Sequence, residues 1–277
     1  MAIGILHPGA MGASIGAALV AGGDVRWTDA GRSPASVTRA RRAGLRAEAT
    51  LEDLTASCDT LISVCPPAAA VELAAAVVAT GFTGTYLDAN AIAPATARAI
   101  GAQVETAGGV FVDGGIIGPP ATTRGATVLY LAGPAAPVAA LHDAFAGSAV
   151  ITETVDGAPG AASAVKMAFA AWSKGTSALL LAIRALAEHE GVAEGLEHAW
   201  STLTPDLLAR LPRTVAGTAP KAWRFAGEMD EIASTFAAAG LPAGFHTAAG
   251  DIYRRLADLR DADAVELADV LDRLAPP

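Results

Sequence analysis

The first half of the chain alternates short runs of β-branched and other apolar residues with longer alanine-rich stretches. The short runs predict buried strands, and the alanine-rich stretches have the length and propensity of helices. The expected strands are residues 2–6, 25–28, 60–64, 85–88, 110–113, 127–132 and 149–152, and the expected helices are residues 10–21, 34–43, 68–79 and 94–107. Strands that alternate with helices indicate βαβ units, and therefore an α/β domain with a mainly parallel sheet.

The pattern changes after about residue 155, and from residue 160 onward only helices are expected. They are residues 161–190, 193–201, 205–210, 221–239, 243–259 and 262–274. We therefore expect an α/β domain over 1–157 and an all-helical domain over 158–277. A first helix of about 30 residues spans ~45 Å, longer than a small domain is wide. Such a helix, rich in small residues, is expected to pack against a second copy of the chain in a homodimer.

Composition and charge narrow the class of partner. Alanine alone fills 68 of the 277 positions, so most of the apolar fraction consists of small side chains. The net charge of −9, with no basic stripe, argues against a nucleic-acid partner. The longest apolar stretch, residues 161–181, carries Lys166 and Lys174, which argues against a membrane-spanning helix.

The cysteines and histidines give no sign of a metal site. Cys58 and Cys65 have neither redox nor zinc spacing, and His142, His189 and His198 are dispersed along the chain. We therefore expect no metal. Two thiols make no disulfide framework, which favours a reducing, cytoplasmic setting.

A glycine-containing turn joins the first expected strand to the first expected helix. In the dinucleotide fingerprint G-x-G-x-x-G, Gly9 and Gly12 occupy the second and third glycine positions, and His7 occupies the first. The glycines of this motif allow a tight turn and let the backbone approach a pyrophosphate at the helix N-terminus. The fold class expected for residues 1–157 is therefore a Rossmann-type, dinucleotide-binding domain. The candidate cofactor-binding residues of the turn are His7, Pro8, Gly9, Ala10, Met11 and Gly12.

The end of the second strand bears on the choice between NAD(H) and NADP(H). Asp29 lies 20 residues after Gly9, where a carboxylate can accept a hydrogen bond from a ribose 2′-hydroxyl. Arg32 and Ser33 follow, and an arginine fork suits a 2′-phosphate. Together with three more arginines at 39, 41 and 42, they favour NADP(H), and Asp29 keeps NAD(H) open. Ser33 is also interpretable as a helix N-cap before a proline.

Two further strand ends point at the same ligand crevice. Cys65, Pro66 and Pro67 close the strand that ends near residue 64, and Asn90 closes the strand at 85–88. Residues just beyond the carboxyl ends of parallel strands line the crevice of such sheets. The prolines are candidates for a rigid wall against the cofactor, and Asn90 for a hydrogen bond to it. The alternative for each is an ordinary turn residue, and for Cys65 a packed small side chain.

One lysine stands in an otherwise apolar helical stretch. Burial of Lys166 would lower its pKa and suit it to proton transfer near neutral pH. Ala170 and Ser173 share its helix face, and Ser173 is a candidate substrate contact because it could reach a substrate together with Lys166. The alternative for Lys166 is a lysine that extends its ammonium group to solvent from the helix edge. Later in the chain, Trp223 lies beside two cations and His246 near a helix start. Both are candidate substrate contacts, and the alternatives are a core tryptophan and a surface histidine.

These motifs resemble the superfamily of 3-hydroxyacid dehydrogenases and 6-phosphogluconate dehydrogenases, to which imine reductases are related. The turn at 8–12 is similar to the family's Gly-x-Met-Gly turn, and 111–118 to its substrate-binding Asp-Ala-Pro-Val-Ser-Gly segment. Residues 157–167 resemble its glycine-rich turn and catalytic lysine. The resemblance implies an NAD(P)-dependent oxidoreductase with Lys166 as general acid/base. It also implies substrate contacts at Gly115, Ile117 and Gly118.

The sequence departs from the family pattern where a polar substrate would be held. Ile117 stands in place of the family's serine, Pro119 lacks an N–H, and Ala170 replaces an asparagine. We therefore expect hydride transfer to or from a small hydroxy or keto compound of the 3-hydroxyacid type. Imine reduction is the alternative. A non-catalytic nucleotide-binding sensor is an alternative of another class.

Overall fold

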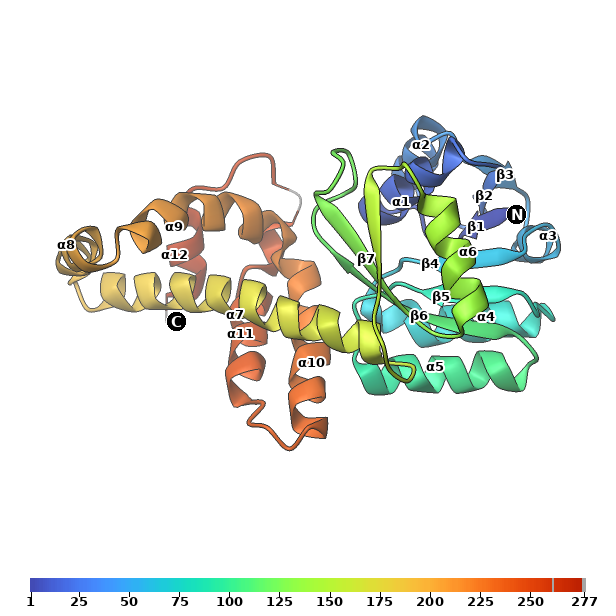
Figure 1. Cartoon of the computed structure of the whole chain (residues 1–277). Coiled ribbons are helices and arrows are strands. Elements are labelled where there is room, and N and C mark those ends of the chain that lie inside the picture. Colours follow the sequence, from blue (N-terminus) through green and yellow to red (C-terminus); the bar gives the residue numbers. More distant parts are fainter. Residues whose placement is uncertain (261, 276–277) are drawn as a thin grey trace. The chain divides into compact units, whose positions relative to one another are not determined.

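The computed structural model describes residues 1–260 and 262–275, and the chain divides into two compact units (Figure 1). The first unit is Met1–Met167 and the second is Ala168–Pro277. One helix, α7 (Ala161–His189), begins in the first unit and continues into the second.

The first unit contains an eight-stranded sheet in the order β3-β2-β1-β4-β5-β6-β7-β8. All neighbouring strands are parallel except β6 and β7, so the prediction of a mainly parallel sheet is confirmed. The strands are β1 (Ile3–Ile5), β2 (Val25–Thr28), β3 (Arg46–Glu48), β4 (Thr60–Ser63), β5 (Thr85–Asp88), β6 (Val110–Ile117), β7 (Thr127–Ala132) and β8 (Val150–Thr154).

Six helices and a short 3-10 turn connect these strands. They are α1 (Ala10–Val20), α2 (Pro34–Arg42), α3 (Leu51–Ala56), a 3-10 turn (Pro67–Ala69), α4 (Ala70–Ala79), α5 (Pro94–Thr106) and α6 (Ala135–Phe145). Three of these elements, β3, α3 and α6, were not predicted from the sequence. The β6 strand is also longer than expected, because the residues that follow Asp113 pair with antiparallel β7.

Apolar side chains cover both faces of the sheet. One buried cluster joins the strands to α1, α2 and α6, and includes Ile15, Ala40 and Phe145. The other joins them to α3, α4 and α5 through Leu54, among others. Because helices cover both faces, the carboxyl edge of the parallel strands is left as the place where loops gather, and ligands bind at that edge in such sheets.

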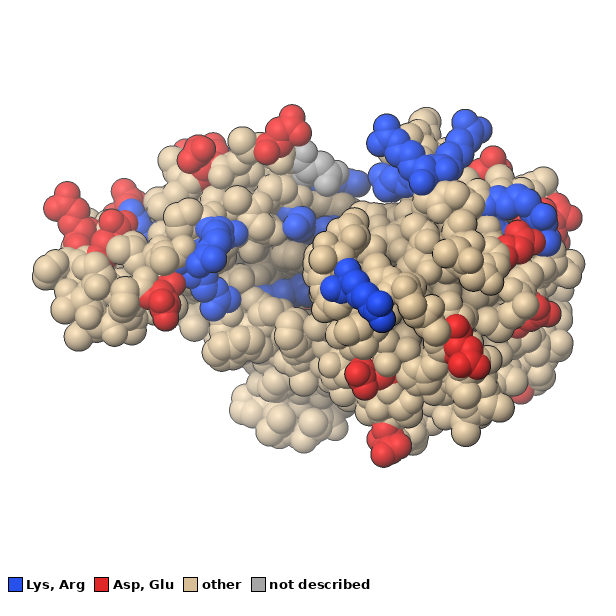
Figure 2. Space-filling view, turned by 45° about the horizontal axis from the view of Figure 1, so that its top comes forward, with Lys and Arg blue, Asp and Glu red and all other residues tan. Residues whose placement is uncertain are grey.

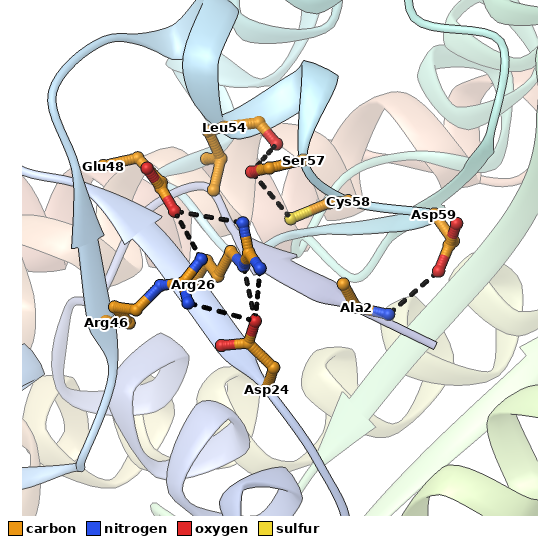
Figure 3. Close-up of polar contacts among 9 residues, drawn as sticks. All are labelled: Ala2, Asp24, Arg26, Arg46, Glu48, Leu54, Ser57, Cys58 and Asp59. Carbon is orange, nitrogen blue, oxygen red and sulfur yellow. Dashed lines mark hydrogen bonds and ion pairs between the residues drawn. The ribbon is translucent and has the colours of Figure 1, made fainter.

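The edge strand β3 carries few apolar side chains and is held by charges instead (Figure 3). Arg26 of β2 pairs with Asp24 and, at 3.2 Å, with Glu48 of β3. Arg46 of β3 approaches Glu48 at 3.0 Å and Asp24 at 3.5 Å. Charged side chains of opposite sign therefore join β3 to β2, and a hydrophobic pattern in the sequence could not have predicted this edge strand.

The second unit is entirely helical in its described residues. After α7 come α8 (Ala193–Leu203), α9 (Pro205–Thr218), a 3-10 turn (Ala219–Lys221), α10 (Ala222–Ala238), α11 (Gly244–Arg255), a 3-10 turn (Ala257–Leu259) and α12 (Leu267–Leu274). Within residues 1–260 and 262–275, no helix has the length and apolar character needed to cross a membrane.

Three predicted helix boundaries in this unit were wrong. The helix expected at 243–259 ends at Arg255 and is followed by the 3-10 turn at Ala257–Leu259. The helix expected at 205–210 continues to Thr218, with Pro212 inside it. Leu211 and Val215 are buried on either side of the proline, and their packing outweighs a penalty of about 3 kcal/mol for an interior proline. The last helix starts at Leu267 rather than at 262, because Glu266 and Asp269 form a capping box that defines its beginning.

Candidate cofactor and active site

The turn between β1 and α1 is tight, and one of its glycines is sterically required. A Cβ atom on Gly12 would lie 2.1 Å from the carbonyl oxygen of His7, which is a backbone atom and cannot move aside cheaply. A Cβ on Gly9 would meet only the His7 ring, at 3.5 Å. Gly12 is therefore needed by the fold itself, whereas the space next to Gly9 is open in the protein without a bound cofactor.

The N-terminus of α1 is free to receive an anion. Gly9 is its N-cap residue and provides no side-chain hydrogen bond, and no acidic residue lies in the first turn. The first intrahelical bond is made by the amide of Ala13, so the amides before it have no partner within the helix. Open space beside Gly9 and unpaired amides at a helix N-terminus fit the pyrophosphate of a dinucleotide.

Two arginines from the β2–α2 region reach this turn. Arg32 donates from Nη2 to the carbonyl of Leu6 at 2.8 Å, and Arg39 donates from Nε to the carbonyl of Pro8 at 3.4 Å. The Nε atom of Arg32 is buried and has no hydrogen-bond partner among the residues that the structure describes. Burial, followed by the charge of Arg32, lowers the pKa of His7, which keeps its imidazole neutral. Basic side chains, including those of Arg41 and Arg42, gather over α2 (Figure 2).

The remaining predicted residues of the β2 end have distinct positions. Asp29 is exposed beyond the strand. Ser33 caps α2, and its hydroxyl accepts a hydrogen bond from the amide of Ser36 at 3.3 Å, before Pro34 at the first helical position. The N-cap interpretation of Ser33 is therefore confirmed.

The ends of β4 and β5 are tied together by one amide side chain. Asn90 accepts from the Cys65 amide at 2.6 Å, and donates to the Ser63 hydroxyl and to Asp88, each at 2.9 Å. A hydrogen bond from the Asn90 amide to a cofactor would have to replace one of its two donor contacts. Asn90 therefore shapes the strand ends, and direct contact with the cofactor stays a prediction.

The chemistry of Cys65 agrees with a packed side chain rather than a nucleophile. Burial raises the pKa of its thiol to about 11, so the thiol is protonated at neutral pH. Pro66, which follows it, is exposed, and Pro67 is half-buried and begins the 3-10 turn. Both prolines therefore lie just after the end of β4, and their contact with the cofactor stays a prediction.

Asp88 is buried beside Asn90, and burial raises the pKa of its carboxyl from 3.8 to about 7. Between these two values the folded chain holds a proton that the unfolded chain has released. The contribution of Asp88 to the free energy of unfolding therefore falls as the pH rises from about 4 to 7.

We expect Asp88→Asn to remove this decline, because an amide does not ionise. The amide creates one unfavourable contact with the Asn90 amide group, but that cost does not vary with pH. The measurement is Tm from pH 5 to 8 for both chains. The Tm difference should shift in favour of the variant as the pH rises. Parallel Tm profiles would contradict a raised pKa at Asp88.

A second buried carboxylate fixes the start of α7. Asp113 of β6 accepts hydrogen bonds from the Ser163 amide at 3.0 Å and from the Ser163 hydroxyl at 2.5 Å. Burial raises the pKa of Asp113, and the bonds from Ser163 oppose this shift. The positive end of the helix dipole also favours the carboxylate form. The sheet therefore holds the first turn of α7 through a side-chain cap.

Close contact between β6 and α7 places Lys166. A Cβ on Gly115 would lie 2.5 Å from the carbonyl of Ala162 and 3.2 Å from Cβ of Lys166, so only glycine lets the strand and helix approach this closely. Gly115 follows Asp113, the register partner of Asp88 at the end of β5. Lys166, which is half-buried, therefore stands at the carboxyl edge of the parallel strands, the same edge as the β1–α1 turn.

The other predicted substrate contacts of the first unit flank this position. Ile117 is half-buried at the end of β6. Gly118 has a φ of +127°, and a Cβ there would lie 2.2 Å from the carbonyl of Ala126. The two residues therefore form the turn between β6 and the segment that leads to β7.

The predicted substrate contacts of the second unit lie on three helices, α7, α10 and α11. Ala170 is buried on α7, and Ser173 lies one turn further along the same helix. Trp223 is stacked beneath the guanidinium group of Arg260, 4.0 Å from the ring centroid.

His246 is buried, which contradicts the surface alternative. Its ring packs against Phe236 with centroids 4.1 Å apart, and burial lowers its pKa. Its Nδ1 atom has no hydrogen-bond partner in the described part of the chain.

Three residues of the site were not predicted as functional, although two lie within quoted motifs. Asp88 and Asp113 are acidic residues at the ends of otherwise apolar strands, and Ser163 precedes Lys166 by three positions. The signal that could have found the two aspartates is a carboxylate at or near the end of an apolar strand. Such a group is buried and must find donors.

The sheet order, the β1–α1 turn and the free helix N-terminus define a dinucleotide-binding protein of the Rossmann class. The sequence comparison agrees, because residues 2–156 match the family model of the NAD binding domain of 6-phosphogluconate dehydrogenase. The chain belongs to this family. It is an oxidoreductase that uses a nicotinamide cofactor. Residues 187–256 match a second model, a domain of unknown function (DUF1932).

Solved structures with the same fold include dehydrogenases and reductases. A conserved protein of unknown function, described as structurally similar to 3-hydroxyacid dehydrogenases, is 27% identical, with 94% of this chain and 98% of that one covered and a TM-score of 0.68. A 3-hydroxyisobutyrate dehydrogenase from Mycobacterium tuberculosis, solved with L-serine, is 21% identical, with 99% of each chain covered and a TM-score of 0.73.

An imine reductase from Streptomyces aurantiacus is 20% identical over the whole of both chains, with a TM-score of 0.54. The search of curated proteins found no match. The family is therefore established by the N-terminal domain, and the resemblance read from the sequence motifs is confirmed.

Proposed function

We propose that the protein reduces or oxidises a small hydroxy or keto compound of the 3-hydroxyacid type, with Lys166 as the general acid/base. The observation that carries this proposal is the contact of Lys166 with Gly115. That contact brings the lysine to the carboxyl edge of the sheet, where the dinucleotide-binding turn also lies. When bound there, a nicotinamide supplies or accepts the hydride.

The chain's own residues supply binding and proton transfer. The amides at the start of α1 hold the pyrophosphate, and Gly9 leaves room for it. Asp113 and Ser163 fix the first turn of α7, so that Lys166 is held in position. The Lys166 ammonium group donates a proton to the substrate oxygen during reduction, and its amine accepts the proton during oxidation.

Reduction of a C=N bond is the second candidate function. It is favoured by Ile117 and Ala170, which cannot hydrogen-bond a carboxylate through their side chains. Pro119 also has no backbone N–H for this purpose. An imine needs fewer such contacts than a hydroxy acid does.

A substrate panel tests both functions. The purified chain is mixed with NADPH or NADP⁺ and with either cyclic imines or 3-hydroxy and 3-keto acids, and absorbance at the nicotinamide band is followed. Turnover of the acids alone supports the dehydrogenase, and turnover of the imines alone supports the reductase. Tight cofactor binding without turnover of either class would favour a non-catalytic sensor and overturn the proposal.

We infer that NADP(H) is the preferred cofactor, with NAD(H) as the alternative. Arg32 and Arg39 reach the β1–α1 turn, and Arg41 and Arg42 lie with Arg39 in the last turn of α2, so four positive charges follow β2 within this short segment. The exposed Asp29 is the competing feature, because it suits the 2′-hydroxyl of NAD(H).

The preference can be measured from the affinities of NADPH and NADH in the native chain and in Arg32→Gln. Loss of a charge-assisted contact to a phosphate costs about 1.5–3 kcal/mol, so NADPH affinity should fall about 10- to 100-fold. NADH affinity should change far less. Arg124→Gln, which removes an exposed arginine away from α2, is the matched control. Tighter binding of NADH than NADPH by the native chain would contradict the inference.

We also propose that two copies associate through α7. Its exposed apolar side chains follow a spacing of three and four residues, with Thr176 completing the repeat: Phe169, Trp172, Leu179, Ile183 and Leu186. Trp172 is 68% exposed. A continuous apolar stripe of this kind is typical of a helix that packs against a partner.

The dimer predicts that Trp172→Glu shifts the mass measured by sedimentation from two chains to one. Leu203→Glu removes another exposed apolar residue outside the stripe and serves as the control, since its mass should stay unchanged. A native chain that sediments as a monomer would exclude this interface.

Cys58 and Cys65 are both free thiols, which suits the reducing, cytoplasmic setting proposed for the protein.

A further inference from the structure

The helical unit contains a pocket of its own, separate from the residues assigned above to the cofactor. Its volume is about 350 Å³. It is lined by residues of four helices of this unit: Ser173, Lys174 and Ser177 of α7; Arg210, Arg213, Thr214, Gly217 and Thr218 of α9; Phe225 of α10; and Tyr253 of α11. Basic side chains are visible on this unit in Figure 2.

The charge of the lining is positive, although the whole chain carries −9. Lys174 is neutralised by Glu228, whose carboxylate lies 2.8 Å from its ammonium group. Among the described residues, Arg210 makes one hydrogen bond, to the hydroxyl of Thr176 at 2.8 Å, and no ion pair. Arg213 makes no ion pair or hydrogen bond within residues 1–260 and 262–275. Two guanidinium groups one helical turn apart are therefore left without a counter-charge.

Hydroxyl groups also line the wall. Thr214 and Thr218 lie one turn apart on α9. Neither hydroxyl makes a hydrogen bond within the described part of the chain, and neither oxygen atom is among the buried polar atoms that lack a partner. Both hydroxyls are therefore accessible from the pocket, where the oxygen atoms of a ligand can bind them.

The opposite wall is aromatic and rigid. Tyr253 is fully buried and donates from its hydroxyl to the carbonyl of Lys174 at 2.6 Å. Phe225 packs edge-on against it, with centroids 5.5 Å apart. The pocket therefore combines a cationic and hydroxyl side with an apolar side, as sites for small organic anions do.

We propose that this pocket binds the carboxylate or phosphate group of a small organic molecule, through Arg210 and Arg213 with the hydroxyls of Thr214 and Thr218. An arginine fork matches the paired oxygens of either group. The carbon part of the ligand lies against Phe225 and Tyr253. The proposal needs neither Lys166 nor a bound nicotinamide, so it can be tested apart from the oxidoreductase reaction.

Calorimetric titration of the full chain without cofactor tests the site. The probes are inorganic phosphate in one arm and succinate in the other, with ionic strength held constant by sodium chloride. Saturable binding of one ligand per chain is expected in at least one arm, and the tighter arm identifies the group. No saturable binding in either arm would overturn the proposal.

Two kinds of variant separate a built site from general charge attraction. Arg210→Gln/Arg213→Gln should weaken binding about tenfold or more, because charge-assisted hydrogen bonds are lost. Arg124→Gln should leave binding unchanged. An equal loss in both chains would mean non-specific attraction and would overturn the site.

A glycine in the wall provides a test that keeps every charge. A Cβ on Gly217 meets nothing within 4 Å, so Gly217→Leu adds a side chain to the pocket without a backbone clash. Binding should fall about tenfold, as for other steric losses of 1–3 kcal/mol. Gly227→Leu places the same side chain in open space on α10 and should bind normally. Equal binding by both leucine variants would contradict the assignment, and Tm confirms that each chain is folded.

Discussion

Replacing Lys166 with methionine is expected to lower kcat by about 10²- to 10⁴-fold, the range typical for loss of a general acid or base. Methionine keeps most of the side-chain volume next to Gly115, so the contact between β6 and α7 is retained. Cofactor affinity should therefore stay close to that of the native chain. A selective loss of kcat, with binding intact, separates proton transfer from a structural role.

Lys221→Met is the matched control for this experiment. Lys221 is one of only three lysines in the chain, and it is exposed at the end of a 3-10 turn in the second unit. Its replacement should leave kcat unchanged. If Lys166→Met turned over substrate at nearly the native rate, another group would have to supply the proton, and the catalytic assignment would be wrong.

The two glycines of the β1–α1 turn are expected to respond differently to alanine. Gly12→Ala places a Cβ against the His7 carbonyl, and overpacking of this kind costs about 1–3 kcal/mol. For a unit of this size, that corresponds to a Tm lower by roughly 2–10 °C. Gly9→Ala meets no such clash and should leave Tm nearly unchanged.

Gly9→Ala should weaken cofactor binding although it leaves Tm nearly unchanged. The added methyl group stands where the pyrophosphate approaches the amides of α1, so NADPH affinity should fall about tenfold or more, while the apo protein keeps its stability. Differential scanning calorimetry and fluorescence titration measure the two effects. Gly195→Ala, at an open helical position of α8, is the control for the glycine-to-alanine change itself. Native cofactor affinity in Gly9→Ala would contradict the placement of the pyrophosphate.

Sequence patterns predicted the fold well where hydrophobicity determines structure. The strands at 25–28, 85–88 and 127–132 were predicted with their observed bounds, because each is a short run of mostly β-branched, aromatic and other apolar residues that the sheet buries. The β3 strand was missed for the opposite reason. Its residues, Arg46–Glu48, are mostly polar, and they pair with β2 through charges that are apparent only once Asp24 and Arg26 lie alongside.

The candidate site was predictable in part. The fingerprint turn and Lys166 could be found because each is a local pattern in one stretch of sequence. The contact between Gly115 and Lys166, by contrast, joins positions 51 residues apart, and so does not appear in any local pattern. The anion pocket could not be predicted for the same reason, because its lining residues come from distant parts of the sequence. Its arginines come from α9, a helix whose predicted end at 210 fell short of its observed end at Thr218, beyond Pro212.

The path of α7 has a consequence for dissecting the protein. Its first seven residues belong to one unit and its remainder to the other, and the helix is continuous across the division. Limited proteolysis should therefore find no exposed loop at which to separate the units there. A recombinant fragment starting at residue 168 would begin within a helix, without the cap that Asp113 gives to Ser163. The two units are accordingly best produced and studied as one polypeptide.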